Sequence, residues 1–423
     1  MQLPFISVIL PVRNEERYIA ACVDSIFSQD YPAEKMEVIF VDGRSEDRTV
    51  ELLHAMQKEH PQIVVLDNPN RTVPYAMNIG IAHSSAPVIV RLDAHAEYPA
   101  DYIRLSVETL LTKDCDNAGG VFETHGRGFM GEAIAEMLKT PLGVGNATYR
   151  LTTEDGYVDT VPFGCFKRAL FDRIGGFDER MTRNQDNELN FRIRKNGGKI
   201  YLNHNIRVQY YCRDTMRGIM KMGYMNGKWN VITMTLVPGS MGIRHFVPLA
   251  FVLSTILLVL LTLLTKSMLF GGLLALEWGA YLLLDFFYSY TIAKEKGWKF
   301  FPVEVILYPA FHFAYGFGSL SGILALPGFI RKEKEKKAAP YILLKLLAGS
   351  TVFPQLFESL DKAALEQIVF VPERRAKDMH KNEPKGVPTI YRMTVKATDM
   401  LFFFRKAQRT VPVIQCDVDL SGV

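Results

Sequence analysis

The chain has 423 residues, of which 48% are hydrophobic and 22% are charged, a composition that supplies a sizeable core and argues against disorder. Its net charge of +4 is too small to indicate a nucleic-acid-binding protein. The five cysteines show no paired C-x-x-C spacing, which excludes the usual zinc signatures and is typical of a reducing compartment.

The first ninety residues alternate between predicted strands and helices. Strands are predicted over residues 5–10, 37–41, 63–66 and 88–92, and helices over 19–27, 46–59 and 75–82. This alternation predicts an α/β fold of the nucleotide-binding type, with a parallel sheet that binds ligands at the carboxyl ends of its strands. Two glycine-rich stretches, 126–131 and 143–145, are predicted to be mobile loops over the site.

Polar residues follow each of the first three strands. Residues 11–15 follow the first strand, and Asp42 ends the second. A carboxylate in that place can accept hydrogen bonds from a base or ribose, so we expect Asp42 to contact a nucleotide. Ser45 and Asp47 are expected only to cap the next helix. Arg71, after the third strand, is either a base or phosphate contact or a solvated surface arginine.

The fourth strand runs directly into Asp93 and His95. Two such side chains at i and i+2 can present an oxygen and a nitrogen to one cation, and Mg²⁺ or Mn²⁺ would neutralise a diphosphate leaving group. The imidazole favours Mn²⁺. Further along, Asp186 stands near the predicted start of a helix. It is either a general base for an acceptor hydroxyl or an ordinary first-turn carboxylate.

Three long apolar stretches follow, over residues 246–265, 268–292 and 305–330. The first contains no charged side chain and is long enough to cross roughly 30 Å of hydrocarbon. A basic segment precedes it, comprising Arg213, Arg217, Lys221 and Lys228 interleaved with large apolar residues. This segment is either a helix in the headgroup layer or an ordinary solvated helix face.

The third apolar stretch presents a conflict of topology. It contains Pro309, Pro327 and four glycines, and basic runs flank it at 294–299 and 331–337. Both runs should face the cytoplasm, and a single crossing cannot satisfy both. Either the stretch is re-entrant or a broken hairpin, or one run is misassigned. The N-terminus shows no signal sequence, so we expect the first domain to be cytoplasmic.

Together these clusters resemble the family 2 glycosyltransferases of the inverting GT-A fold, most closely the succinoglycan-type bacterial exopolysaccharide enzymes. The resemblance covers roughly residues 4–330 and is specific through the order and spacing of its motifs. The residues that carry it are Ser-Val-Ile-Leu-Pro-Val-Arg-Asn-Glu at 7–15, Val-Asp-Gly-Arg-Ser at 41–45, Arg-Leu-Asp-Ala-His-Ala at 91–96, Gly-Gly-Phe-Asp-Glu at 175–179 and Gln-Asp-Asn-Glu-Leu at 185–189.

The resemblance implies a role for individual residues. The residues expected to bind the nucleotide-sugar are Pro11, Arg13, Asn14, Glu15, Asp42, Arg71 and Asp93. Asp93 and His95 take the place of the metal-binding Asp-x-Asp motif, with histidine as the second member. Asp186 matches the catalytic aspartate of a Glu-Asp pair, although Gln185 replaces the glutamate. Gly164 and Arg168 match a segment on the acceptor side.

The expected protein has three parts: a GT-A nucleotide-diphospho-sugar transferase domain over 1–240 that ends in an interfacial helix, about three transmembrane segments over 241–330, and a cytoplasmic extension of unknown role over 331–423. It would move a sugar from a UDP-sugar to a lipid-linked glycan at the inner (plasma) membrane, using Mg²⁺ or Mn²⁺. The processive Gln-x-x-Arg-Trp motif is absent, which favours single additions. A processive synthase and a catalytically silent membrane scaffold are the alternatives.

Overall fold

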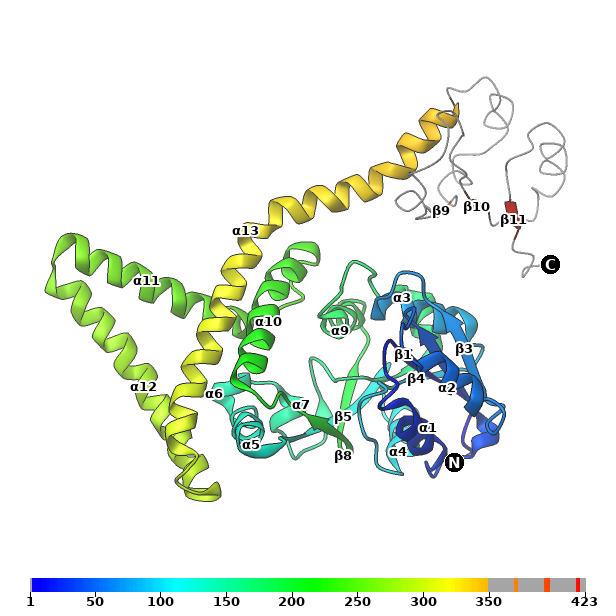
Figure 1. The fold of residues 1–423 in the computed structure, drawn as a ribbon, viewed down its shortest axis with the longest axis horizontal. Coiled ribbons are helices and arrows are strands. Elements are labelled where there is room, and N and C mark those ends of the chain that lie inside the picture. Colours follow the sequence, from blue (N-terminus) through cyan, green and yellow to red (C-terminus); the bar gives the residue numbers. More distant parts are fainter. Residues whose placement is uncertain (1, 349–368, 372–391, 396–415, 419–423) are drawn as a thin grey trace. The chain divides into compact units, whose positions relative to one another are not determined.

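The computed structural model describes residues 2–348, 369–371, 392–395 and 416–418, and it divides into two compact units, Met1–Ala325 and Leu326–Val423 (Figure 1). An eight-stranded sheet forms the centre of the first unit. Its strands are β1 (Ile6–Val12), β2 (Met36–Asp42), β3 (Ile63–Asp67), β4 (Val88–Arg91), β5 (Asn117–His125), β6 (Gly156–Tyr157), β7 (Cys165–Lys167) and β8 (Ile200–Tyr211). Their order in the sheet is β3-β2-β1-β4-β7-β5-β8-β6.

Helices cover the sheet and extend beyond it. The shorter ones are α1 (Ile19–Phe27), α2 (Thr49–Met56), α3 (Val73–His83), α4 (Tyr102–Thr112), α5 (Gly128–Met137), α6 (Pro141–Val144), α7 (Thr148–Leu151), α8 (Arg168–Ile174) and α9 (Gln185–Lys195). The longer ones are α10 (Met216–Leu236), α11 (Val247–Thr265), α12 (Met268–Lys296) and α13 (Phe301–Ala348). Two 3₁₀ turns, Ala33–Lys35 and Ile243–Phe246, connect neighbouring elements.

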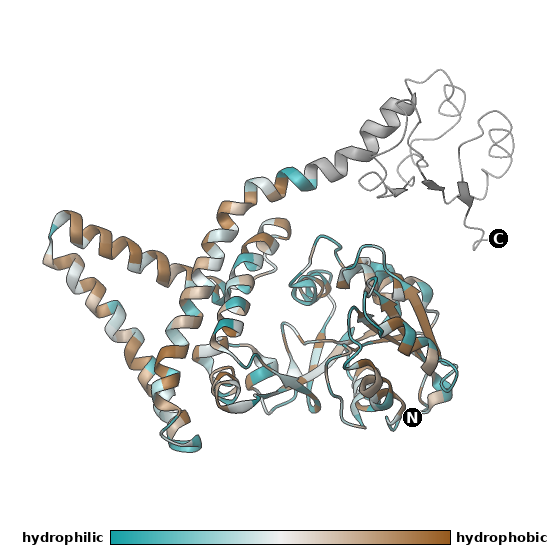
Figure 2. Ribbon diagram, in the orientation of Figure 1, coloured by the Kyte–Doolittle hydropathy of each residue, from teal (hydrophilic) through white to brown (hydrophobic). Residues whose placement is uncertain are grey.

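The first half of the sheet confirms the predicted α/β class. Strands β1 to β4 are all parallel, with β1 between β2 and β4. Side chains on both faces are buried, as Val8 and Ile9 of β1 show, because helices cover both sides of the sheet. Brown strands in Figure 2 mark this continuous apolar layer.

The second half is mixed rather than parallel. Strand β7 is antiparallel to both β4 and β5, whereas β8 runs parallel to β5. A register shift between Gly119 and Val121 brings β5 very close to β8. A Cβ at Gly120 would lie 1.8 Å from the carbonyl oxygen of Ile206, so only glycine fits there. Three-residue β7 is too short to show a periodic pattern, which is why the sequence predicted no strand there.

The two glycine-rich stretches predicted to be mobile loops belong largely to helices α5 and α6, so that prediction is wrong. A Cβ at Gly126 would lie 1.9 Å from the backbone of Gly131, and a Cβ at Gly143 would lie 2.2 Å from the carbonyl oxygen of Met137. These glycines permit close backbone packing. Side chains of α5 join a buried cluster with α10, α12 and α13, whose members include Ile134, Ile219 and Leu307.

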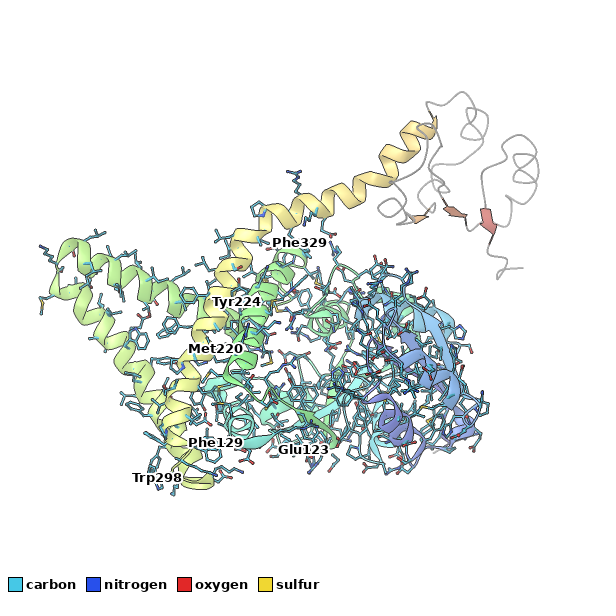
Figure 3. The ribbon with its side chains drawn as sticks, in the orientation of Figure 1. Glu123, Phe129, Met220, Tyr224, Trp298 and Phe329 are labelled. Carbon is cyan, nitrogen blue, oxygen red and sulfur yellow. The ribbon has the colours of Figure 1, made fainter. Side chains whose placement is uncertain are left out.

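Helices α10 and α13 pack backbone against backbone. A Cβ on Gly227 would lie 2.0 Å from the carbonyl oxygen of Tyr315, and one on Gly318 would lie 2.0 Å from that of Tyr224. The Tyr224 hydroxyl also donates to the Ser321 hydroxyl oxygen at 2.7 Å. Figure 3 labels Tyr224 on α10. Small residues spaced at i and i+4 allow two helices to approach so closely. Gly223 and Gly227 have this spacing on α10, and Gly318 and Gly322 have it on α13.

Among the residues that the structure describes, three helices are long and apolar enough to cross a membrane, over Ile243–Thr265, Met268–Lys296 and Phe301–Glu333. The alternative that the third stretch is re-entrant or broken is not observed, because α13 continues through Pro309 and Pro327. A proline in a helix frees one carbonyl, whereas a re-entrant loop would leave many backbone groups to be satisfied.

The second unit contains a small three-stranded sheet of order β11-β10-β9, made by β9 (Val369–Val371), β10 (Arg392–Val395) and β11 (Cys416–Val418). Strand β10 is antiparallel to β9 and parallel to β11. The remainder of the extension predicted over 331–423, beyond the end of α13, lies outside the described residues.

Replacing Gly227 with alanine tests the contact between α10 and α13. The added methyl has no room, so we expect Gly227→Ala to lower the free energy of unfolding by about 1–3 kcal/mol. Gly279→Ala in α12 is the matched control, because its Cβ would meet nothing within 4 Å. Thermal unfolding in detergent measures both, and a Gly227→Ala protein as stable as Gly279→Ala would contradict the close packing.

Candidate functional site

The carboxyl end of β2 holds the first predicted nucleotide contact. Asp42 is buried and lies in register with Val12 of β1. The Ser45 hydroxyl donates to Asp42 Oδ1 at 2.6 Å and accepts a hydrogen bond from the Asn14 backbone N–H at 2.9 Å. Ser45 therefore links the loop after β1 to Asp42, and the prediction that it caps α2 is wrong.

The next turn joins the same two loops. Asp47 accepts hydrogen bonds from the Thr49 backbone N–H at 3.0 Å and from the Glu16 backbone N–H at 3.1 Å. It therefore contacts the start of α2, but the prediction that it serves only that helix is wrong. The Thr49 hydroxyl oxygen in turn accepts a hydrogen bond from the Glu15 backbone N–H at 2.8 Å. These contacts hold the two loops at one edge of the sheet.

Three of the turns at this edge use a left-handed residue that is not glycine. They are Asn14, Arg44 and Arg71, with φ of 57°, 57° and 62°, and each follows one of β1, β2 and β3. This conformation costs about 1–2 kcal/mol for an L-residue. Strain of this kind concentrates at functional sites, where the surrounding structure compensates for it.

The structure brings most of the predicted nucleotide residues together. Arg13 and Arg71 lie 3.9 and 3.7 Å from the same carboxylate oxygen of Glu46, and the Asn14 side chain accepts a hydrogen bond from the Glu46 backbone N–H at 2.8 Å. Both arginines are about half exposed, so these ion pairs are weak and their guanidinium groups face solvent. Pro11 lies within β1 in register with Val41 and shapes the backbone.

Asp93 and His95 follow β4 at the same edge. The Asp93 backbone N–H donates to the buried Tyr98 hydroxyl at 2.8 Å, which fixes the turn. His95 Nδ1 lies 3.2 Å from the Glu15 carboxylate, so the loop after β1 also reaches this pair. The hydrogen bond to Glu15 raises the pKa of His95, burial opposes it, and the charge of Asp93 adds to the increase.

This pair fits a divalent ion that is shared with a diphosphate. Within the described residues, no group of three or more His, Cys, Asp or Glu side chains is arranged to hold a metal ion. Mg²⁺ in phosphate-transfer sites, however, usually has only one or two protein ligands and takes the rest from phosphates and water. The carboxylate and imidazole side chains are 21% and 62% exposed, so both can be reached by a ligand.

A buried arginine joins this pair to the predicted base. Arg91, at the end of β4, is 3% exposed, and its Nη2 lies 3.3 Å from Asp93 Oδ1. Its Nη1 donates to Asp186 Oδ1. Burial raises the pKa of Asp186 and the nearby charge of Asp93 adds to the effect, whereas Arg91 lowers it. Sequence reasoning assigned Arg91 no role, although an arginine that ends an entirely apolar strand was the available signal.

The polypeptide also supports Arg91 from the other side. Its backbone N–H donates to the carbonyl of Gly164 at 3.0 Å, and its guanidinium carbon lies 5.6 Å from the centre of the Phe163 ring. Gly164 has φ of 86°, and a Cβ there would lie 2.5 Å from the Phe166 ring. Gly164, predicted on the acceptor side, thus lies directly beside Arg91.

Arg168, by contrast, is not brought to this edge. Its backbone N–H donates to the carbonyl of Pro87, just before β4 begins, and its Nη1 donates to the carbonyl of Ile81 at 2.8 Å. Since β4 runs from Val88 to Arg91, Arg168 lies at the opposite end of the strand. Antiparallel pairing of β7 with β4 carries it away from the site.

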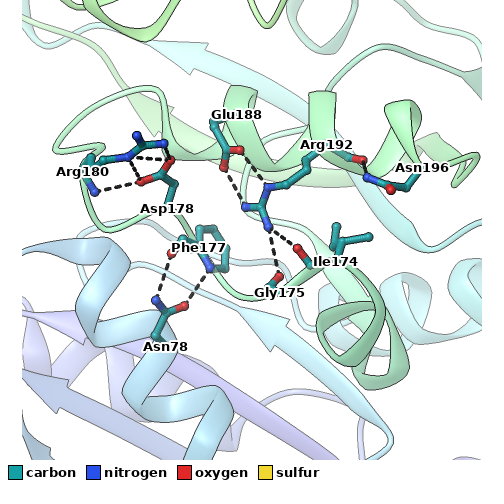
Figure 4. A network of polar contacts seen from close by, with 9 residues as sticks. All are labelled: Asn78, Ile174, Gly175, Phe177, Asp178, Arg180, Glu188, Arg192 and Asn196. Atoms are coloured by element: carbon teal, nitrogen blue, oxygen red, sulfur yellow. Dashed lines mark hydrogen bonds and ion pairs between the residues drawn. The ribbon is translucent and has the colours of Figure 1, made fainter. Parts of the chain in front are cut away.

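A polar network fixes the position of α9, which carries Asp186 (Figure 4). Arg192 pairs with Glu188 at 2.7 Å, and its Nη1 donates to the carbonyls of Ile174 at 2.8 Å and Gly175 at 3.1 Å. The start of the Gly-Gly-Phe-Asp-Glu motif therefore holds this helix in place through hydrogen bonds to Arg192. We call this contact the brace.

The same motif also docks on α3. Asn78 accepts from the backbone N–H of Phe177 at 2.7 Å and donates to its carbonyl at 2.9 Å. Gly176 must be small, because its Cβ would lie 2.3 Å from the Asn78 oxygen.

A cavity of about 410 Å³ lies beside this brace, lined by Gly176, Asp178, Arg180, Glu188, Phe191, Arg192, Lys195 and Val237. It contains none of the predicted site residues.

Comparison with known proteins agrees with this geometry. A family profile described as "Glycosyl transferase family 2" matches residues 7–175. A dolichyl N-acetyl-α-D-glucosaminyl phosphate 3-β-D-2,3-diacetamido-2,3-dideoxy-β-D-glucuronosyltransferase of Methanococcus voltae is 31% identical over 225 residues, which are 51% of this chain and 70% of that protein. The succinoglycan biosynthesis protein ExoA of Rhizobium meliloti is 28% identical over 57% of this chain and 74% of its own length.

The fold has a counterpart among solved structures. The mannosyltransferase PcManGT from Pyrobaculum calidifontis, solved in complex with GDP-Man and Mn²⁺, aligns with a TM-score of 0.51 at 21% identity. The alignment covers 73% of this chain and 87% of that one, and it shows a shared fold. Sheet, family profile and relatives agree: the chain belongs to glycosyl transferase family 2 and is a glycosyltransferase of the GT-A fold.

Proposed function

We propose that this chain is a membrane-bound inverting glycosyltransferase that moves a sugar from a nucleoside diphosphate, UDP in our prediction, to a lipid-linked acceptor. The observation that carries the proposal is the Arg91 bridge. One buried guanidinium contacts Asp93, which faces the expected diphosphate, and Asp186, which can accept a proton. Two carboxylates with different tasks are thereby held at one reaction centre.

The donor would lie across the ends of β1 and β2. Asp42 is the carboxylate placed to accept hydrogen bonds from the nucleoside, and Arg13 and Arg71 are the nearby cations. The complex of PcManGT with GDP-Man supports a nucleoside diphosphate donor.

Lipid linkage of the acceptor is supported by two observations. The Methanococcus relative is named for a dolichyl phosphate-linked sugar, and the Rhizobium relative for succinoglycan biosynthesis. Three apolar helices in this chain are long enough to hold the enzyme at the membrane where such acceptors reside. We place residues 1–240 in a cytoplasmic GT-A domain, residues 241–330 in the inner membrane and residues 331–423 in a cytoplasmic extension.

The reaction would be a single displacement. Asp186 accepts the proton of the acceptor hydroxyl as its oxygen forms a bond to the anomeric carbon. The bond from that carbon to the diphosphate oxygen breaks, the nucleoside diphosphate leaves with the electron pair, and the configuration inverts. Burial raises the pKa of Asp186, which makes its carboxylate a stronger base than an exposed aspartate. Arg91 keeps that carboxylate oriented.

A divalent cation would be held by Asp93 and His95. When bound, it supplies positive charge that stabilises the diphosphate as it leaves. The Mn²⁺ in the PcManGT complex supports such an ion. Glu15 orients the imidazole through Nδ1, which leaves Nε2 as the nitrogen to bind the ion.

Asp186→Asn should lower turnover by about 10²–10⁴-fold, because the amide cannot accept the proton, while UDP binding stays intact. Release of UDP by membranes supplied with several UDP-sugars measures turnover. In the wild type, the rate should fall as the pH drops through the raised pKa of Asp186, at a higher pH than an ordinary aspartate would give. Asp172→Asn, at an exposed position of α8, is the control, and full turnover by Asp186→Asn would rule out its role as base.

Arg91→Met should leave Asp93 and Asp186 without the cation between them. We expect the free energy of unfolding to fall by up to about 3–5 kcal/mol at pH 8, and by less at pH 5. The loss is smaller at pH 5 because removal of Arg91 raises the pKa of Asp186 further. Protonation of Asp186 then relieves its repulsion with Asp93. Adding Asp186→Asn should restore part of the stability; a double variant no more stable than Arg91→Met would contradict this account.

His95→Asp should change the metal preference. A carboxylate in place of the imidazole favours Mg²⁺ relative to Mn²⁺. A lower concentration of Mg²⁺ should therefore be enough to displace bound Mn²⁺ in the presence of UDP. Electron paramagnetic resonance of Mn²⁺ measures this directly and does not depend on turnover. If His95→Asp and wild type exchange the two ions alike, His95 is not a ligand.

A further inference from the structure

Three arginines outside the predicted nucleotide residues make no ion pair within the described chain. They are Arg150 in α7, Arg183 in the turn before α9, and Arg213 between β8 and α10. Arg13, Arg71 and Arg91 at the donor side and centre all have carboxylate partners. Uncompensated guanidinium groups beside a reaction centre favour an anionic ligand.

Arg150 is held in place by aromatic rings instead of by an acid. Its guanidinium carbon lies 4.7 Å from the centre of the Tyr210 ring, 5.0 Å from that of Phe122 and 5.6 Å from that of Tyr149. Its Nη1 donates to the Thr124 hydroxyl oxygen at 3.0 Å. Ring contacts orient the group but leave its charge and most of its donors available.

Arg183 has a neutral partner and a cationic neighbour. Its Nη1 donates to the Asn226 side chain of α10 at 3.0 Å. Burial lowers the pKa of Arg183, and the positive charge of Arg213 lowers it further. An anion bound here would relieve the repulsion.

The order of strands separates this cluster from the donor. The nucleotide residues follow β1, β2 and β3, and β4 carries Arg91 between the two halves. Arg150 lies in α7, Arg213 follows β8, and Arg183 contacts Asn226 of α10. Helix α10 packs directly on α13 (Figure 1). A ligand reaching the arginines therefore meets the site on the side of the apolar helices.

We propose that Arg150, Arg183 and Arg213 bind the phosphate group that joins the lipid of the acceptor to its sugar. This inference rests on the proposed function. Guanidinium forks bind phosphate oxygens through two parallel hydrogen bonds, and here they need not first release a carboxylate. Arg183 precedes Asp186 by three residues, so a phosphate anchored there would keep the attached sugar near the proposed base.

Binding of a short polyprenyl phosphate tests the proposal separately from turnover. The full-length protein in detergent is titrated with farnesyl phosphate, with farnesol as the same chain without phosphate, and with UDP plus Mn²⁺. We expect farnesyl phosphate to bind more tightly than farnesol. Arg150→Gln and Arg183→Gln should each weaken the binding of farnesyl phosphate roughly ten-fold or more. The binding of farnesol and of UDP should not change. Unchanged UDP binding also shows that the variants fold.

Arg194→Gln, an exposed arginine of α9 without an ion pair in the described chain, is the control for loss of one charge. The proposal is overturned if farnesol binds as tightly as farnesyl phosphate, or if Arg194→Gln weakens binding as much as the other two. It is also overturned if Arg150→Gln and Arg183→Gln weaken the binding of UDP instead, because the cluster would then hold the donor diphosphate. Loss of sugar transfer with this binding pattern intact would count against the proposed function alone.

Discussion

One ion-pair arrangement determines the centre of this enzyme: a buried guanidinium between two carboxylates. Asp93 and Asp186 would repel each other at close range, and burial would drive one of them to bind a proton. Arg91 removes the repulsion and still leaves the pKa of Asp186 above its ordinary value. The rest of the fold keeps Arg91 buried, through the end of β4, the carbonyl of Gly164 and the ring of Phe163.

The two halves of the sheet on either side of that centre differ in strand direction and in the residues they carry. The parallel half, β3-β2-β1-β4, ends in left-handed turns that bring together the residues proposed to bind the nucleotide. Beyond β4 the antiparallel strand β7 changes the direction of the chain, and β5 and β8 lead toward α7 and α10. Arg91 lies where the two halves meet, so in the proposed function its two carboxylates would serve donor and acceptor respectively.

The helices that could cross a membrane also contact the catalytic part. Gly227 and Gly318 let α10 and α13 touch along their backbones. From there a polar chain leads back to the site: Tyr315 accepts a hydrogen bond from Asn230, whose oxygen accepts one from Asn184 at 2.7 Å. Asn184 immediately precedes α9, the helix of Asp186. This chain of hydrogen bonds links α13 to the residue that precedes the helix of the proposed base.

The sequence by itself determined the first four strands, the α/β class, the apolar helices and the family, because each depends on local periodicity or on residues at a fixed spacing. It also singled out Asp93 and Asp186 as separate candidates. Only the tertiary structure decided that they share Arg91, since 95 residues separate Arg91 from Asp186 in the chain. Long-range packing likewise turned glycine-rich stretches into helices and placed Arg168 at the wrong end of β4 for a role in the site. Contacts of this kind depend on which surfaces meet, and no local pattern of residues records that.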